Sequence, residues 1–158
     1  MDLKYLLTGT PARMRFTHRW ATSRVKFPES VAEHSYFVCL YAILIAVEVY
    51  DGQKQPEDLD SFLGEVLSRA VVHDLEECRT GDIHRPFKYS SPEMKCSMDA
   101  AGEAAIEQVI NPIFDQDISL NYLLGLWIMS KDNSVAGHIV RFCDFLCVLS
   151  FLWQEGAG

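Results

Sequence analysis

The sequence of 158 residues contains no segment in which apolar and polar residues alternate with the period of two that marks a half-buried β-strand. It also has no internal repeat, no low-complexity tract and no linker long enough to divide the chain. A chain of this length suits one compact domain that buries roughly two-thirds of its unfolded surface. These absences predict an all-α fold and a single domain over residues 1–158.

The cysteines lack the pattern of a disulfide framework. There are five of them, an odd number, and no C-x-x-C spacing occurs. Cys39, Cys143 and Cys147 lie in apolar surroundings in the sequence. Structural disulfides are rare in reducing compartments, so this usage predicts buried, reduced thiols in a cytosolic protein.

Long apolar runs are also missing. The most apolar run, residues 36–47, is about twelve residues long, against the roughly twenty needed to span a bilayer. It is expected to be a buried helix or part of a subunit interface, which favours a homo-oligomer. Nothing at the N-terminus resembles a signal peptide. We therefore expect a cytoplasmic protein without a membrane partner.

Positive charge is in short supply. Fourteen Lys and Arg face twenty-two Asp and Glu, which gives a net charge of −8 and repels the phosphate backbone of a nucleic acid. A nucleic-acid polymer is therefore not an expected partner. Five of the cations nevertheless gather within residues 13–26, and this segment either binds a small anion or is solvated surface; they are Arg13, Arg15, Arg19, Arg24 and Lys26.

Capping and turn signals divide the chain into helices. Ser30 and Glu33 form an S-x-x-E capping box, which predicts a helix from about residue 31 to about residue 50. An apolar stripe predicts the next helix over about residues 56–77. Later signals predict helices from the Ser91 cap to Asn111-Pro112, from 117 to about 129, and from 133 or 134 to about 153. The expected architecture is a bundle of about five to seven helices.

An adjacent His73-Asp74 pair lies near the end of the striped helix. Asp74 is the next position on the apolar stripe, and His73 and Glu77 lie four residues apart on its flank. Neighbouring residues of a helix cannot both face one core. A polar His-Asp pair on the buried side of a helix therefore calls for one common explanation. A divalent cation supplies one, because imidazole and carboxylate bind the same ions.

Asp144 lies in the middle of an apolar segment. Burial of an ionised carboxylate there is unfavourable unless a metal or a basic side chain, such as Arg141, offsets it. Two histidines and an acid on three separate predicted helices, His34, His73 and Asp144, are easier to explain as one site than independently.

The series His34, His73-Asp74 and Asp144 resembles the H…HD…D signature of the HD-domain phosphohydrolases. Within that superfamily the chain is similar to bacterial 5′-deoxynucleotidases and to the compact dATP triphosphohydrolases of phages. The likeness extends from about Arg13 to Leu149 and implies a single HD domain. It is carried by Arg19-Trp20, residues 29–35, His73-Asp74, Glu77, Thr80-Gly81-Asp82 and Lys88-Tyr89.

The resemblance implies a role for each site residue. One divalent ion would be bound by two imidazole nitrogens and two carboxylates, from His34, His73, Asp74 and Asp144. Co, Mn, Zn, Fe and Mg each fit part of this ligand set. By the same resemblance, Glu77 would act as general acid or base, and Asp82 would orient the attacking water.

The substrate side of the site is expected around a cation and an aromatic ring. Arg19 and Lys88 are candidate phosphate-binding residues, because a guanidinium binds phosphate oxygens bidentately and Lys adds a point charge. Trp20, following the family, would border the sugar or base and help select deoxyribonucleotides. A Trp in a small domain is also commonly a core residue.

These features predict a metal-dependent enzyme that hydrolyses the 5′ phosphoester of a 2′-deoxyribonucleotide. The short sequence after Asp144 is more like the phage enzymes, which favours a dATP-type triphosphohydrolase releasing deoxynucleoside and triphosphate. The alternative is a 5′-deoxynucleotidase that releases phosphate from a deoxynucleoside monophosphate. A non-catalytic nucleotide sensor is a further alternative, against which the presence of Glu77 and Asp82 argues.

Overall fold

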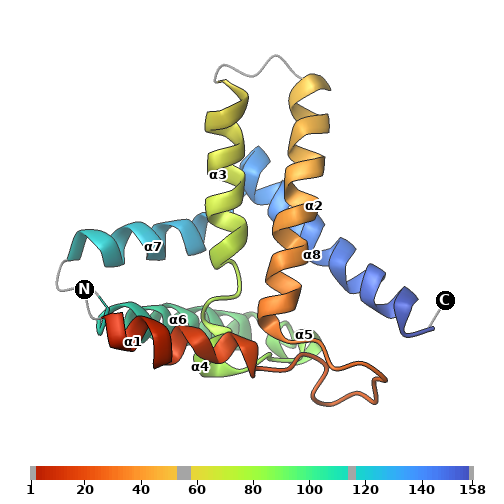
Figure 1. The fold of residues 1–158 in the computed structure, drawn as a ribbon. Helices are drawn as coiled ribbons and strands as arrows, with labels where there is room; N and C mark the ends of the chain where they lie inside the picture. Colours follow the sequence, from red (N-terminus) through yellow and green to blue (C-terminus); the bar gives the residue numbers. More distant parts are fainter. Residues whose placement is uncertain (1–2, 53–57, 114–116, 157–158) are drawn as a thin grey trace. The chain divides into compact units, whose positions relative to one another are not determined.

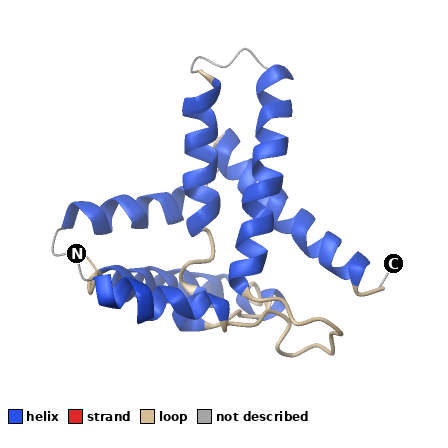
Figure 2. Ribbon diagram, viewed as in Figure 1, coloured by secondary structure: helices blue, strands red, loops and turns tan. Residues whose placement is uncertain are grey.

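The computed structural model describes residues 3–52, 58–113 and 117–156. Within these ranges the regular structure is helical and no strand occurs (Figure 2). A single antiparallel bridge joins His18 and Ser30. The predicted all-α class is confirmed.

Contacts along the chain divide it into two compact units. The first unit comprises residues 1–33 and 74–124, and the second unit comprises residues 34–73 and 125–158. Each unit is therefore assembled from two separate segments of sequence. A single domain over residues 1–158 stays a prediction.

Three helices form the core of the second unit: α2 (Val31–Gly52), α3 (Leu59–Val72) and α8 (Val135–Gln154). α2 and α3 run antiparallel, and α8 crosses them (Figure 1). Burial of apolar surface is the main favourable term in such packing. The shared core consists of Val38, Ala42, Ala46, Phe62, Val66, Ala70, Ala136, Ile139, Val140, Cys143 and Cys147.

The helix starts follow the predicted caps. Ser30 Oγ accepts a hydrogen bond from the Glu33 backbone N–H at 3.2 Å, and Glu33 Oε2 accepts one from the Ser30 N–H at 2.7 Å. This reciprocal pair is a capping box and begins α2. The Ser91 hydroxyl caps α6 (Pro92–Ile110) by accepting a bond from the Met94 N–H, and the Ser134 hydroxyl caps α8 by accepting one from the Gly137 N–H.

The helix predicted over residues 56–77 is divided in the structure. α3 ends at Val72, a turn follows, and a separate single turn, α4 (Glu77–Thr80), comes next. The expectation that His73 and Glu77 share the flank of one continuous helix is therefore wrong. The prediction rested on an apolar stripe that ends where α3 ends. The stripe therefore could not show whether the helix continues to Glu77. Pro56 lies outside the described residues.

The first unit contains the long helix α6 and several shorter elements. These are α1 (Leu3–Thr8), the 3-10 helix η1 (Thr10–Arg15), α4, α5 (Arg85–Lys88) and most of α7 (Asp117–Met129). α4 contacts η1 and α6, and α5 also contacts α6. The sequence signals did not predict α1, η1 or α5. Apart from the four-residue turns α4 and α5, the described α-helices agree with the predicted five to seven.

Two helices meet the length and composition of a membrane span, over Val31–Tyr50 and Val135–Gln154. The twelve-residue run read from the sequence was shorter because it stopped before Glu48, whereas the helix continues past it. Core helices of soluble proteins pass the same test. Here both helices contribute to the core of the second unit.

Candidate metal centre

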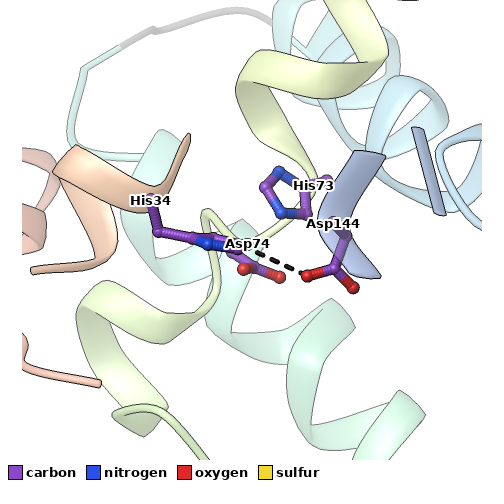
Figure 3. A group of neighbouring side chains, drawn as sticks. All are labelled: His34, His73, Asp74 and Asp144. Atoms are coloured by element: carbon purple, nitrogen blue, oxygen red, sulfur yellow. Dashed lines mark ion pairs between the residues drawn. The ribbon is translucent and has the colours of Figure 1, made fainter. Parts of the chain in front are cut away.

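Four side chains form a group that could hold a metal ion: His34, His73, Asp74 and Asp144. One potential ligand atom from each lies within 4.8 Å of the others, and Figure 3 shows the side chains directed toward a common point. All four are residues that the sequence predicted as ligands. The structure therefore brings the whole predicted set together.

The fold places these residues at the ends and middle of core helices. His34 lies in the first turn of α2, His73 directly follows α3, and Asp144 lies in the middle of α8. These three belong to the second unit. The chain passes into the first unit at the peptide bond between His73 and Asp74, so Asp74 is covalently tied to the ligand-bearing helix.

The imidazoles are buried and oriented. His34 is fully buried, and its Nε2 lies 3.2 Å from Asp144 Oδ1. The rings of His34 and His73 are 5.5 Å apart. The Nδ1 of His73 lies 2.7 Å from the carbonyl oxygen of Ala70, which can only accept. Nδ1 of a neutral His73 therefore carries the proton, and Nε2 keeps the lone pair that a metal needs.

The chemistry of this donor set fits a divalent cation. Two nitrogens and two carboxylates are typical ligands of Zn and of related first-row ions. Asp144 lies among apolar residues of the α8 sequence, and its Oδ1 lies 3.2 Å from His34 Nε2. The Arg141 guanidinium instead donates to the carbonyl oxygens of Lys131 and Asp132. The residues present thus fit the metal that the family resemblance implies.

A cluster of acids surrounds Glu77 in the first unit. The pKa of Glu77 is raised well above its usual value, chiefly by burial and then by the negative charges of Asp74, Asp82 and Glu76, while the Arg19 guanidinium opposes the shift. Glu77 Oε2 is buried without a hydrogen-bond partner among the described residues. The side chain is therefore placed to carry a proton.

Arg19 is held by two carboxylates. Its Nε lies 3.4 Å from Glu29 Oε2, and its Nη1 lies 3.3 Å from Asp74 Oδ2. The backbone supports this placement, because the Arg19 N–H donates to the Glu29 carbonyl oxygen at 2.8 Å. The sequence signals gave Glu29 no role of its own. A carboxylate ten residues after an arginine carries no local pattern that would have revealed the pair.

Trp20 has an unusual backbone conformation. Its φ angle is +63°, in the left-handed region that bulky residues rarely adopt. The Trp20 backbone N–H donates to Asp82 Oδ2 at 3.1 Å. Such local strain persists only where the surroundings hold it, and it is commonly found at functional sites. One visible function of Asp82 is therefore to hold Trp20, and its predicted role toward water stays a prediction.

Lys88 lies apart from these interactions. It is the last residue of α5 and is partly exposed. Within the described ranges its ammonium group makes no hydrogen bond or ion pair. The Lys88 ammonium group is therefore available for an anion. No contact links it to the other predicted site residues that the structure describes.

Comparison with known proteins gives consistent matches. A family model described as 5′-deoxynucleotidase YfbR-like matches residues 7–156. The chain is 34% identical to a 5′-deoxynucleotidase of Vibrio cholerae, over 93% of this chain and 73% of that protein. It is 26% identical to a dATP triphosphohydrolase of Salmonella phage PMBT28, over 97% of this chain and 71% of the phage protein. The predicted resemblance is confirmed.

The fold is also found among solved structures. The chain matches an HD-domain phosphohydrolase from Listeria innocua with a TM-score of 0.78 and 21% identity, over 96% of this chain and 69% of that one. A conserved hypothetical protein from Pyrococcus furiosus matches with a TM-score of 0.73 and 21% identity, over 99% of this chain and 85% of that one. At these identities the likeness concerns the fold.

Proposed function

Because the chain belongs to the 5′-deoxynucleotidase YfbR-like family, we propose that it hydrolyses the 5′ phosphoester of 2′-deoxyribonucleoside monophosphates. The products would be a deoxynucleoside and phosphate. The observation that carries the proposal is the convergence of His34, His73, Asp74 and Asp144 within 4.8 Å in a chain of this hydrolase family. Relatives named 5′-deoxynucleotidases favour this reading over the dATP triphosphohydrolase predicted first.

The four grouped residues would hold one divalent ion. Such an ion neutralises phosphate charge and makes a water molecule more acidic at neutral pH. The tautomer of His73 is suited to this role, because its Nδ1–H is taken up by Ala70. Asp74 would be oriented by the Arg19 guanidinium.

Glu77 would transfer the proton that the reaction requires. In hydrolysis, a water oxygen forms a bond to phosphorus and the bond between phosphorus and the 5′ oxygen breaks. The 5′ oxygen takes the proton of Glu77, and the proton released by the attacking water restores the Glu77 carboxyl. Glu77 lies among Asp74, Asp82 and Glu76, where ionisation is disfavoured by burial and by like charge. A protonated carboxyl at this place can act as the general acid.

The remaining residues would bind the substrate. The Nε of Arg19 lies near Glu29 and its Nη1 near Asp74, so its guanidinium would be oriented before phosphate binds. Trp20, held by Asp82, would form a wall beside the sugar and select against the ribose 2′-hydroxyl. Lys88 would add a positive charge to the phosphate end.

A substrate panel tests the proposal. Metal-loaded protein is incubated with dAMP, AMP, dATP and ATP, and deoxynucleoside, phosphate and triphosphate are measured separately. We expect deoxynucleoside and phosphate from dAMP and far less product from AMP. The same panel with Co, Mn, Zn, Fe and Mg identifies the supporting metal. Absence of turnover with every deoxynucleoside monophosphate and every metal would refute the proposal.

A dATP triphosphohydrolase is the second candidate. It is supported by the phage relative, which matches over 97% of this chain. Release of intact triphosphate from dATP, with no phosphate from dAMP, would establish it in place of the first. Binding of deoxynucleotides without turnover of either would instead point to a nucleotide sensor.

We also propose that the chain self-associates in the cytoplasm. Both long helices of the second unit expose large apolar side chains, including Tyr36 and Leu44 on α2 and Phe142 and Trp153 on α8. Exposed apolar area of this kind is commonly covered by a partner. Light scattering at several protein concentrations tests it, and a monomer throughout would contradict it.

A further inference from the structure

Arg69 is a buried cation in the second unit that no predicted role accounts for. Its side chain is 6% exposed, and it lies in the last turn of α3, four residues before His73. A buried guanidinium is unfavourable unless its donors are satisfied. The bonds it makes therefore show what it is there to hold.

The guanidinium of Arg69 reaches the segment that leads into α8. Its Nη1 donates to the Ser134 hydroxyl at 2.6 Å and to the Met129 carbonyl oxygen at 3.1 Å, and it lies 3.3 Å from Asp132 Oδ1. Its Nη2 donates to Glu65. Because Ser134 is also the N-cap of α8, Arg69 binds the first turn of the helix that carries Asp144.

The segment that leads into α8 is also held by contacts of its own. Asp132 Oδ1 accepts a hydrogen bond from the Ser134 backbone N–H at 2.9 Å. Gly137 faces this carboxylate, and a Cβ at that position would lie 2.4 Å from Asp132 Oδ1. Arg141 donates to the carbonyl oxygens of Lys131 and Asp132 from the next turn of α8. Little room remains for the segment to shift.

Helix packing and the bonds of Arg69 both restrain this unit. The core between α3 and α8 contains Phe62 together with smaller and branched residues, and contact between apolar side chains is non-directional. Such contact opposes a slide of one helix along the other less sharply than directional bonds do. The hydrogen bonds of a planar guanidinium are directional and oppose such a slide. Arg69 therefore sets the position of α8 along α3.

That position matters for the metal centre. At 1.5 Å per residue, His73 lies about 6 Å along the chain from Arg69, and Asp144 lies about 15 Å along α8 from Ser134. Both spans are single rigid stretches that begin at the Arg69 bonds. On the basis of the proposed metal-dependent function, we propose that Arg69 is a positioning residue that sets the distance between His73 and Asp144.

Cobalt binding provides a test with a readout independent of catalysis. Co(II) is titrated into metal-free protein, and its affinity and visible absorption bands are recorded for wild type, Arg69→Met, Arg69→Lys and Val66→Ala. Val66 is a fully buried α3 residue of the same core, so its variant controls for loss of stability. Thermal unfolding is measured for each variant alongside the titration.

We expect Arg69→Met to weaken Co(II) binding by about tenfold or more and to alter the absorption bands, as for other residues that orient ligands. Arg69→Lys keeps the positive charge but lacks the planar guanidinium, so it should retain part of the Co(II) affinity that Arg69→Met loses. Val66→Ala should lower the unfolding temperature and leave affinity and bands unchanged. If Arg69→Met does not fold, Gly137→Ala, whose added Cβ would displace Asp132, carries the same expectation.

Two results would overturn the inference. One is wild-type affinity and bands in the Arg69 variants, and the other is an equal loss of affinity in Val66→Ala. Both leave the proposed function intact, because wild type still binds the ion. Failure of the wild-type protein to bind any of Co(II), Mn(II), Zn(II), Fe(II) and Mg(II) would instead remove the proposed function and this inference with it.

Discussion

The polar residues of the second unit and those of the first unit are held in place by different means. His34, His73 and Asp144 project from helices that share an apolar core, so packing sets their positions. Glu77 and Asp82, in contrast, lie on a four-residue helix and the turn after it. Glu77 is buried, and charged side chains, including Asp82, lie near it.

The difference suggests a division of tasks. A metal ligand must be fixed in space, which long, packed helices achieve. A proton-transfer group must instead have its proton affinity adjusted, which nearby charges and burial achieve. If this division is correct, substitution of the second-unit ligands, or of Asp74 where the first unit resumes, should affect metal binding. Substitution of Glu77 should affect turnover while the metal stays bound.

Removal of a ligand from the second unit should have the largest effect. We expect Asp144→Ala to lose both the metal and detectable hydrolysis, because only three of the four grouped ligands remain. Elemental analysis and a phosphate-release assay measure the two. Asp99→Asn, which alters an exposed pair with Lys95, is the matched control and should change neither. Full metal content in Asp144→Ala would remove Asp144 from the ligand set.

Glu77→Gln should distinguish proton transfer from metal binding most clearly. It keeps the shape of the side chain and removes its acid, so we expect hydrolysis to fall by about 10²–10⁴-fold with the metal content unchanged. Activity near the wild-type level would exclude Glu77 as the proton donor. Loss of the metal in this variant would break the proposed division between the units.

Trp20→Gly tests the strained turn of the first unit. Glycine adopts φ of +63° freely, so relief of about 1 kcal/mol of backbone strain should offset part of the lost packing. Without the ring, we expect the preference for dAMP over AMP to fall by about tenfold or more. Trp153→Ala, at a 76% exposed position, is the control. An unchanged preference in Trp20→Gly would assign sugar selection elsewhere.

The smallest expected effect is on the pH dependence of stability, through Asp132, which contacts Arg69. Burial alone would raise the pKa of Asp132, but hydrogen bonds from Ser134 and the charges of Arg69 and Arg141 lower it below the ordinary 3.8. A carboxyl whose pKa is lowered by folding stabilises the protein above pH 3.8, and this contribution is lost as the pH falls through the lowered pKa.

Metal-free wild type should therefore be more stable than Asp132→Asn at pH 7, and the difference should shrink below about pH 4. Denaturant unfolding at a series of pH values measures it. A difference that stays constant down to pH 2.5 would show that the charge of Asp132 does not contribute to the contacts around Arg69.

Much of the fold follows from local signals in the sequence. The capping box at Ser30 and the caps at Ser91 and Ser134 are formed within four residues, so they were readable without tertiary information. The break after Val72 was missed because the apolar stripe stops there and nothing local marks the turn. The α5 turn is a single turn without an apolar stripe, and such elements have no periodic signal.

The sequence alone determined the all-α class, the main helices and the identity of the four grouped residues, because helix periodicity, capping and the resemblance to HD proteins are all written along the chain. Only the tertiary structure decided what surrounds them. The bond from Asp82 to Trp20, the pairing of Arg19 with Glu29 and the contacts of Arg69 with Ser134 join segments separated by between 10 and 65 residues. Directional contacts of this kind depend on how the chain folds back on itself, which no local pattern encodes.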